Sequence, residues 1–450
     1  MTPNPSLRAP LRILPEFILT VLIVASICYV AWFFYWFGYL PQPFLYDTND
    51  TFMDWYNTSY WANNAGAYDV WRSVYPPLSF VFLKIFSIKS CYMTSPFLGR
   101  NCDWYGRLAL SIFYIANVIL IFRCYWAIDR RTALLRGAAM AFGLPMLFAL
   151  ERGNLIVPCF TAFALGHSRL LRQTWARWLN IALTINFKPY LLLAVIPYAL
   201  QRRWRWLMGC ATATVLIYLF SYAIEGAGGL SELYANTINW TNFTGTQLWN
   251  EIYYSTSYAT LVAFINGQFP ILDYVGSWTI EKARLILPIT ILAGQCAVLA
   301  CLAGAWMRPG IVPTYRLTAL CLVMAMTTAS PGGYSEVFLL FLVFMEPWQG
   351  SGKIIALIAA YILCISADYV VLPIQHNDSF SWLGGRTVYA EFGVAVGQFL
   401  RPGLLLTIEF ALAAVSLSAI AKAFRPVRLG GIGEKFSAPP AYGNEAMQKP

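Results

Sequence analysis

Long uncharged apolar runs constrain this chain more than any other feature of its sequence. Several of them reach the length of a membrane span and contain almost no charge. A helix of roughly 20 apolar residues crosses the hydrocarbon core of a bilayer, whereas the apolar stretches of soluble domains are shorter. These runs are residues 13–37, 205–224, 284–307, 353–374 and 402–424. The sequence therefore predicts a polytopic membrane protein built from packed helices.

The overall composition agrees with that class. Hydrophobic residues make up 58% of the 450 positions, charged residues make up only 12%, and the mean hydropathy is +0.56. Soluble domains are close to half apolar and about one quarter charged, so the composition argues against a single soluble domain of this length. We expect an all-α fold with about twelve transmembrane helices and with interfacial helices on the exterior side.

The net charge of +10 does not indicate a nucleic-acid-binding protein, because of where the basic residues lie. They form short clusters between the apolar runs, and the acidic segments 41–75 and 225–256 alternate with these clusters. Basic loops mark the cytoplasmic face of membrane proteins. We therefore expect both termini in the cytoplasm and two large exterior loops, at 38–106 and 225–283. The clusters are Arg8 and Arg12; Arg130, Arg131 and Arg136; Arg169, Arg172 and Arg177; and Arg202, Arg203 and Arg205.

A single transmembrane domain is predicted for residues 1–424, followed by a cytoplasmic tail at 425–450. The tail is rich in Gly, Pro and polar residues and is expected to be disordered. The first apolar run is longer than the hydrophobic part of a signal peptide and lacks a convincing small-residue cleavage site. It is therefore interpreted as a retained membrane anchor.

Two pairs of shorter apolar segments interrupt the series of full-length spans. Each half is shorter than a span, and irregular backbone at membrane depth must be surrounded by protein or by a water-filled cavity. The two breaks therefore predict an internal cavity that opens towards the exterior face. The first break, at Glu151–Arg152–Gly153–Asn154, separates 137–150 from 153–168. The second break, at Phe187–Lys188–Pro189, separates 175–186 from 189–201.

The exterior segment after the first run concentrates carboxylates in a chain that is poor in charge. Asp47, Asp50 and Asp54 lie within YDTNDTFMDWYN. A partly buried carboxylate can act as a general base on an acceptor hydroxyl. Each Asp could instead cap a short helix or lie in solvent, and Asp47 fits a cap or scaffold role best. Further along, Pro76 and Pro77 precede an apolar stretch too short to span, which is expected to form an interfacial or re-entrant helix.

Arg152 and Lys188 lie at the two helix breaks, where a cation without a partner or a function is costly. Transfer of a sugar from a lipid phosphate needs cations that stabilise the departing phosphate, and these two side chains could supply them. Arg152 could instead pair only with Glu151 or with one of the Asp side chains.

The cysteines and histidines give little indication of a metal site. Cys91 and Cys102 both lie in the first predicted exterior loop, where they could form a disulfide in an oxidising compartment or stay free. His167 and His376 are the only histidines, and the sequence has no Cys/His spacing of a zinc site. No metal site and no cofactor is expected, although a pair of Asp side chains could still recruit a divalent cation.

Four motifs follow one another in order along the chain. They are Asp54, with Asp50 nearby; Tyr75–Pro76–Pro77–Leu78; Arg152–Gly153–Asn154; and Lys188–Pro189, which opens a segment ending in a basic and aromatic cluster. The set resembles the GT-C superfamily of membrane glycosyltransferases, specifically its family 87 branch, from about residue 15 to about residue 345. A late Ser330–Pro331 pair also fits, but Tyr334–Ser335–Glu336 follows where many members have a Trp and one or two histidines.

The family 87 branch includes polyprenyl-phosphomannose-dependent mannosyltransferases of the bacterial envelope. The resemblance implies an inverting glycosyltransferase in the bacterial inner membrane, with its site facing the exterior. It would move a sugar, with mannose favoured, from a polyprenyl-phosphate donor to an envelope lipid or glycan acceptor. The implied roles are general base for Asp54, or alternatively Asp50; donor phosphate binding for Arg152 and Lys188; and substrate contact for Tyr75, Asn154, Glu336 and Asp47.

Two other functions stay open from the sequence. A transporter or flippase of a lipid-linked saccharide would also have discontinuous helices with internal charges. Transporters often contain internal repeats, and the two halves of this chain show no convincing self-similarity. A structural partner in envelope polysaccharide synthesis would use the acidic loop only as a docking surface.

Overall fold

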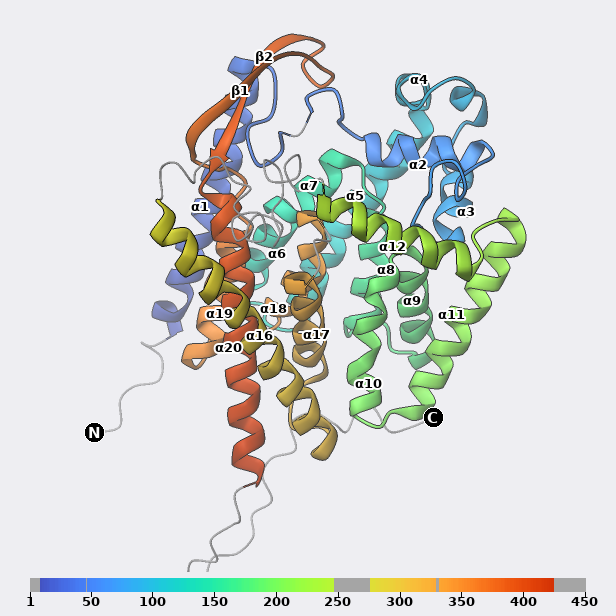
Figure 1. Cartoon of the computed structure of the whole chain (residues 1–450). Coiled ribbons are helices and arrows are strands. Elements are labelled where there is room, and N and C mark those ends of the chain that lie inside the picture. The colour runs from blue at the N-terminus through green and yellow to red at the C-terminus, as the bar shows by residue number, and fades with distance from the viewer. Residues whose placement is uncertain (1–8, 46, 247–275, 329–331, 425–450) are drawn as a thin grey trace, which may run out of the picture.

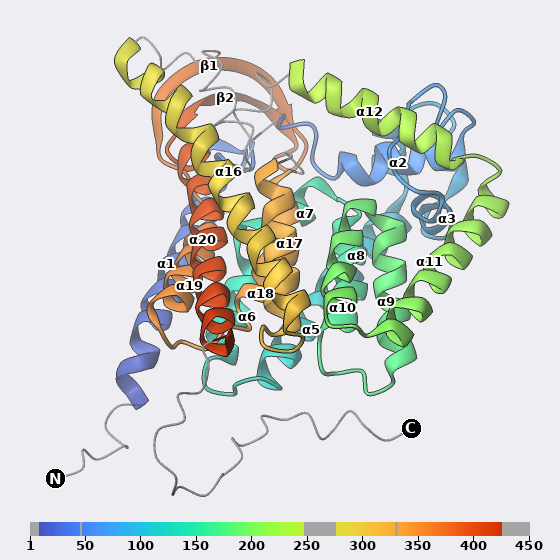
Figure 2. The ribbon, with the colours of Figure 1, turned by 60° about the horizontal axis from the view of Figure 1, so that its bottom comes forward.

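The computed structural model describes residues 9–45, 47–246, 276–328 and 332–424. These residues are mostly helical, and the longer helices stand side by side in a bundle (Figures 1 and 2). Short helices and a β-hairpin cover one end of the bundle, here called the hairpin end. The start of α1 and the end of α20 lie at the other end, here called the terminal end (Figure 1).

Within the described residues, six helical segments are long and apolar enough to cross a membrane, which indicates an integral membrane protein. Four of the five predicted spans, all except 353–374, lie within these segments and are confirmed as long helices. The segments are α1 (Ala9–Phe37), α5 (Trp104–Trp126), α6 (Ala133–Phe142) with α7 (Leu144–Arg152), α11 (Trp204–Glu225), α16 (Ser277–Met307) and α20 (Gly397–Phe424).

Shorter helices pack among the long ones, and the two predicted breaks lie between them. Gly153, with a φ of 64°, ends one helix, and Pro189, which has no backbone N–H, begins the helical turn after the other break. Both predicted breaks are therefore confirmed. The shorter elements are α8 (Ile156–His167), α9 (Thr174–Phe187), η3 (Pro189–Val195), α10 (Ile196–Leu200), α17 (Thr314–Thr328), η4 (Gly333–Ser335), α18 (Glu336–Val343) and α19 (Ser351–Leu363).

The predicted span at 353–374 is wrong. Helix α19 ends at Leu363, and the chain then forms an antiparallel hairpin of β1 (Val370–Ser381) and β2 (Arg386–Ala395), with Asn377 opposite Ala390. Val370 and Val371 are β-branched, and Pro373 cannot continue a helix. The apolar run is therefore half helix and half strand, and the all-α expectation lacks this hairpin.

The remaining short helices lie at the hairpin end. The helix expected after Pro76 is confirmed as α3, which begins at Pro77. The tail at 425–450 and residues 247–275 of the second predicted exterior loop lie outside the described residues. The elements at this end are α2 (Met53–Asn63), α3 (Pro77–Ile85), η2 (Lys89–Tyr92), α4 (Pro96–Cys102) and α12 (Leu230–Thr246).

The core of the bundle lies around α18, whose eight residues are all buried. Phe338 and Phe341 of this helix pack edge-on against Phe163 of α8, with ring centroids 4.9 and 6.2 Å apart. Tyr125 of α5 donates a hydrogen bond to the carbonyl of Phe341 at 3.1 Å. This aromatic packing holds α8 firmly, and the break between α7 and α8 lies at its upper end.

Candidate functional site

Arg152 joins two of the three predicted carboxylates. Its guanidinium lies 2.5 Å from Oδ2 of Asp50 and 2.9 Å from Oδ1 of Asp54. The second oxygen of Asp54 accepts a hydrogen bond from Nδ2 of Asn154 at 2.7 Å. These side chains come from the loop before α2, from the first turn of α2 and from the break after α7. We call the four residues the carboxylate clamp.

The clamp forms because the start of α2 lies directly on the break between α7 and α8. The backbone N–H of Phe52 donates to the carbonyl of Glu151 at 2.8 Å. A Cβ at Gly153 would lie 2.9 Å from the carbonyl oxygen of Phe52, closer than real Cβ atoms come. Phe52 has a φ of 63°, which is strained for a residue with a side chain. Glycine at 153 is therefore required both by its backbone conformation and by this close approach.

Asn154 has two tasks at the break. It is fully buried, and its side-chain oxygen accepts a hydrogen bond from the backbone N–H of Ile156 at 3.0 Å. That bond satisfies one of the N–H groups left free at the start of α8. Its amide nitrogen then points at Asp54, so helix capping and carboxylate binding use opposite ends of one amide.

The clamp holds more negative than positive charge. Glu151 lies next to Arg152, and its Oε1 accepts from the hydroxyl of Thr51 at 3.2 Å, so one guanidinium faces three carboxyl groups. Burial raises the pKa of Asp50 above its usual value, and the neighbouring Asp54 and Asp47 raise it further, while Arg152 opposes the shift. A carboxylate whose pKa is raised is a better proton acceptor near neutral pH.

Asp47, the third Asp of the loop, lies outside the clamp. Its side chain is exposed and accepts a hydrogen bond from the backbone N–H of Asn49 at 2.8 Å, which closes a local turn. A small cavity of about 10 Å³ adjoins it, with Thr51 and Glu151 in its wall. That volume has room for about one water molecule. The larger internal cavity predicted from the two helix breaks stays a prediction.

Lys188, at the second helix break, lies in a separate aromatic cluster. Its ammonium group is 3.3 Å from the hydroxyl of Tyr75 and 4.4 Å from the centre of that ring. Nearby, the hydroxyl of Tyr190 is 3.0 Å from Oγ of Ser335. No carboxylate in the described part of the chain lies within ion-pair distance of Lys188. Its positive charge is therefore held by an aromatic ring and a hydroxyl.

Tyr334 connects the clamp with the Lys188 cluster. It lies close enough to interact electrostatically with Asp54 and Arg152 on one side, and with Tyr75 and Tyr190 on the other. The sequence prediction included Tyr334 in a motif but gave it no role. Its place directly after Gly332 and Gly333 was the signal that could have indicated it. Ser330 and Pro331 of the same motif lie outside the described residues.

Glu336 does not join the clamp. It is 2% exposed, and neither carboxylate oxygen has a hydrogen-bond partner among the described residues. Its electrostatic neighbours are Arg401 and Cys364. Arg401 is already bound to Asp368, with an oxygen–nitrogen distance of 2.5 Å. The structure therefore separates Glu336 from the other predicted substrate contacts.

A basic and aromatic contact missed by the sequence prediction covers the loop. Arg100 of α4 donates to the carbonyls of Asn49 at 2.6 Å and of Thr51 at 2.9 Å. Its guanidinium also lies 4.7 Å from the ring centre of Trp382, at the tip of the hairpin. Burial lowers the pKa of Arg100 to about 10. This contact could not be predicted, because the hairpin itself was not.

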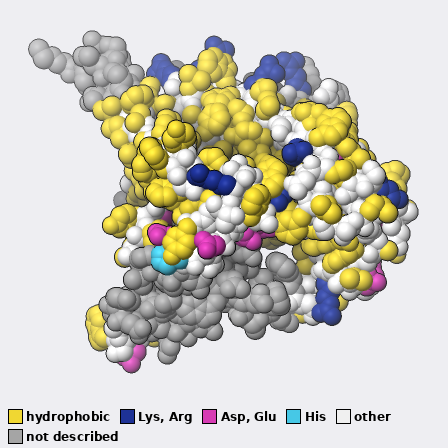
Figure 3. All heavy atoms as spheres, turned by 90° about the horizontal axis from the view of Figure 1, so that it is seen from above, with side chains coloured by type: hydrophobic (Ala, Val, Ile, Leu, Met, Phe, Trp, Pro, Cys, Tyr) yellow, Lys and Arg dark blue, Asp and Glu magenta, His cyan; other side chains and the backbone are white. Residues whose placement is uncertain are grey.

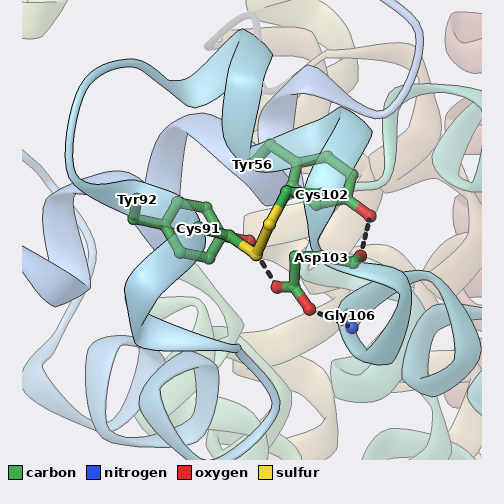
Figure 4. The surroundings of a disulfide bond; sticks show 6 residues. All are labelled: Tyr56, Cys91, Tyr92, Cys102, Asp103 and Gly106. Carbon is green, nitrogen blue, oxygen red and sulfur yellow. Dashed lines mark hydrogen bonds between the residues drawn. A yellow bond between two sulfur atoms is a disulfide. The ribbon is translucent and has the colours of Figure 1, made fainter.

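Cys91 and Cys102 form a disulfide, with a Cα–Cα distance of 5.6 Å (Figure 4). The bond joins η2 to α4, and both of these elements contact α2. Beside it, the carboxylate of Asp103 accepts hydrogen bonds from the hydroxyl of Tyr92 at 2.6 Å and from the backbone N–H of Gly106 at 3.0 Å. The Tyr56 hydroxyl of α2 donates to the carbonyl of Asp103 at 3.1 Å. The disulfide therefore belongs to the support that positions α2.

Seen from the hairpin end, hydrophobic side chains cover much of the visible surface, and the visible acidic side chains lie at several separate places (Figure 3). Among the residues that the structure describes, no group of three or more His, Cys, Asp or Glu side chains could hold a metal ion. Comparison of the chain with protein-family models, with curated proteins and with solved structures found no match.

Proposed function

We propose that this protein is an inverting glycosyltransferase that takes its sugar from a polyprenyl-phosphate donor, with mannose favoured. The observation that carries the proposal is the carboxylate clamp. Two carboxylates, an Arg and an Asn meet at a helix break, close to the lysine and tyrosine side chains of the second break. Ionisable groups gathered at breaks in membrane helices mark functional sites. The resemblance to the GT-C family rests on the ordered sequence motifs alone.

In the proposed reaction, Asp54 accepts the proton of the acceptor hydroxyl. The acceptor oxygen then bonds to the anomeric carbon as the bond from that carbon to the phosphate oxygen breaks, and polyprenyl phosphate leaves. The side chain of Asp54 is 20% exposed, so an acceptor can reach it, and Arg152 and Asn154 fix its orientation. Asp50 is the alternative base, because burial raises its pKa and its side chain is still 17% exposed.

The geometry favours Lys188 over Arg152 as the ligand of the donor phosphate. Arg152 already pairs with two carboxylates, so its charge is largely neutralised. Within the described part of the chain, Lys188 contacts the hydroxyl and ring of Tyr75 and pairs with no carboxylate, so its charge stays available for an incoming anion. A cation at a leaving phosphate stabilises the charge that develops in the transition state. We therefore assign orientation of the carboxylates to Arg152 and phosphate binding to Lys188.

The proposed setting is an inner bacterial membrane with the hairpin end facing the exterior. The six long segments, the five shorter apolar helices and α9 would together supply the predicted number of about twelve crossings. The Cys91–Cys102 disulfide at the hairpin end supports an oxidising exterior compartment. The acceptor is an envelope lipid or glycan, and no cofactor is part of the proposal.

The test is a transfer assay with purified protein, a radiolabelled polyprenyl-phosphate sugar and candidate envelope acceptors. We expect Asp54→Asn to lower kcat by about 10²–10⁴-fold, the usual loss when a general base is removed. Asp50→Asn is compared directly, because the larger loss identifies the base. Lys188→Gln is expected to raise the KM for the donor. Asp69→Asn is the control, since this exposed Asp of the same segment bonds only to its own turn.

Full activity in both Asp variants would overturn the assignment of the base. A transporter or flippase would be indicated if no donor gave turnover while proteoliposomes moved a lipid-linked saccharide across the bilayer. Such a result would reject the glycosyltransferase proposal, whether or not the Asp variants change the behaviour of the protein.

A further inference from the structure

A long groove lies along α20, on the side of the bundle away from the clamp. Its volume is about 1150 Å³, more than the roughly 300–1,000 Å³ of common small-molecule pockets. Helices α16 and α19 form the other walls, and both pack directly against α20. Small side chains make the floor, among them Gly403, Ala411, Ala414 and Ser418. The helices that form the groove stand next to one another in Figures 1 and 2.

The groove is as long as a membrane is thick. It extends along α20 from Gly403 to Lys422, which are 19 positions apart. At 1.5 Å per residue this is about 28 Å, close to the roughly 30 Å of the hydrocarbon core. Phe410 and Ile355 line it and are partly exposed, at 36% and 46%. The acyl chains of one phospholipid reach across about half of the hydrocarbon core, so they fit within this length and against its apolar walls.

The half of the groove nearer the terminal end is positively charged. Lys353 follows Gly352, which packs against Ala411 and Val415 in the middle of α20, and Lys422 lies further along, near the end of α20; both lysines line the groove. Arg316 also lines the groove, but it is bound to Glu346 at 2.5 Å and adds no net charge. Among the described residues that line the groove there is no Asp or Glu. The first turn of α19 lies beside Lys353 and has no side-chain cap, so its free N–H groups add positive potential.

We propose that this groove binds one anionic phospholipid, with the phosphate at Lys353 and Lys422 and the acyl chains along α20. Basic pockets between transmembrane helices suit acidic lipid headgroups, and each Lys near an anionic lipid adds a modest attraction. A zwitterionic lipid would fill the apolar part equally well but would gain little from the two lysines. The proposal does not depend on the glycosyltransferase function, because the groove contains no residue of the clamp.

The experiment compares phosphatidylglycerol with phosphatidylcholine as ligands of the purified full-length protein in detergent. Native mass spectrometry counts the bound lipids at equal lipid concentrations. We expect wild type to retain one phosphatidylglycerol in preference to phosphatidylcholine. In Lys353→Gln/Lys422→Gln that preference is expected to fall by about 30-fold, as loss of two lysine contacts predicts. The control Lys89→Gln/Arg131→Gln removes two exposed charges elsewhere and is expected to keep it.

A second variant tests the groove itself without weakening the fold. A Cβ at Gly403 would have no neighbour within 4 Å, so Gly403→Leu fits and also improves helix propensity. We expect it to reduce binding of phosphatidylglycerol at unchanged thermal stability. Inorganic phosphate at millimolar concentration is expected not to compete, since the acyl chains carry much of the affinity.

Four outcomes would overturn the proposal. One is equal retention of the two lipids by wild type. Another is an equal loss of preference in the lysine variant and its surface control. The third is a dimer that disappears in Gly403→Leu, which would show that the groove holds a second copy of the chain. Competition by inorganic phosphate alone would likewise contradict a lipid and indicate a simple anion site.

Discussion

The ionic clusters at the two ends of the bundle differ in how their charges are paired. At the terminal end, Arg136 binds Glu16 through two hydrogen bonds of 2.7 and 2.8 Å, and both side chains are almost completely buried. Arg316 and Glu346 form a second pair there. At the hairpin end, the guanidinium of Arg152 pairs with the carboxylates of both Asp50 and Asp54, and the Arg152 side chain is 12% exposed.

The difference lies in how completely the charges are balanced. Arg136 also donates to the carbonyls of Phe344 and Glu346, both at 2.7 Å, and the Tyr361 hydroxyl donates to Glu16 at 2.8 Å. Such a closed network holds helices together and leaves little room for a ligand. The carboxylate clamp keeps surplus negative charge and partial exposure, as a site that must still bind something would. Charge balance thus separates a structural cluster from a candidate site.

The largest effect on stability is expected at the terminal end. Arg136→Met leaves Glu16 buried without its partner, and breaking a buried ion pair destabilises a protein by about 3–5 kcal/mol. The unfolding midpoint in detergent measures this, with exposed Arg131→Met as the control. If the single variant fails to fold, Glu16→Leu/Arg136→Met removes both charges and is expected to recover most of the stability. An unchanged midpoint in Arg136→Met would mean that the pair is not structural.

Removal of the disulfide is expected to have the next largest effect. Cys91 and Cys102 are 11 positions apart, and closure of a loop of this length stabilises a fold by about 3 kcal/mol. Replacing both by Ser is therefore expected to lower the unfolding midpoint and to reduce transfer activity, since η2 and α4 support α2. Cys124→Ser/Cys321→Ser, two buried free cysteines, is the comparison. Equal midpoints for the two double variants would argue against a specific role for the bond.

Gly153→Ala is expected to have a smaller effect on stability, of about 1–3 kcal/mol, together with a large loss of activity. Its φ of 64° disfavours a side chain, and the new Cβ would push Phe52 and the start of α2 away from the break. Gly226→Ala distinguishes the effect of backbone strain from the effect of the close contact with Phe52. Gly226 has a φ of 75° but no atom within 4 Å of an added Cβ, so it reports the backbone strain alone. Similar activity in both variants would show that the close approach does not position the clamp.

The smallest effect is expected from the pH dependence of Asp50. Its pKa in the folded protein is raised above its usual value, so the folded state binds a proton more readily than the unfolded chain. The ionised side chain therefore opposes folding above the raised pKa, and this opposition disappears as the pH falls towards about 4, the pKa of a free Asp. Asp50→Asn is expected to unfold at a higher temperature than wild type at pH 7.5, and the difference is expected to vanish near pH 4. A variant less stable than wild type at pH 7.5 would reverse the sign and would place Asp50 among the structural charges.

Much of the fold could be predicted because membrane helices are determined by composition over a long window. The runs that became α1, α11, α16 and α20 contain little but apolar residues, and in a bilayer each must satisfy its backbone internally. The same criterion, hydrophobicity over a long window, wrongly predicted a full-length helix at 353–374. Hydrophobicity alone does not distinguish a helix from an apolar strand, and Val370, Val371 and Pro373 were the local signals that favoured the hairpin.

The candidate site could be predicted in part. Asp50 and Asp54 were identified as carboxylates in a charge-poor chain, Arg152 as a cation at a helix break, and Asn154 from the resemblance to the GT-C superfamily. Their pairing could not be predicted, since the two segments are about a hundred positions apart and no local rule fixes their register. Glu336 was assigned to the site from its place after the Ser330–Pro331 motif of the resemblance, and in the structure its carboxylate is buried apart from the clamp.

By itself, the sequence determined the membrane class, the two helix breaks and the residue types available for chemistry. Only the tertiary structure decided that Arg152 is occupied by carboxylates while Lys188 is not, and that Tyr334 lies between them. The physical reason is the distance along the chain over which each effect acts. Hydrophobicity and backbone preference act within a segment, whereas the electrostatic environment of a charged group depends on which distant segments pack around it.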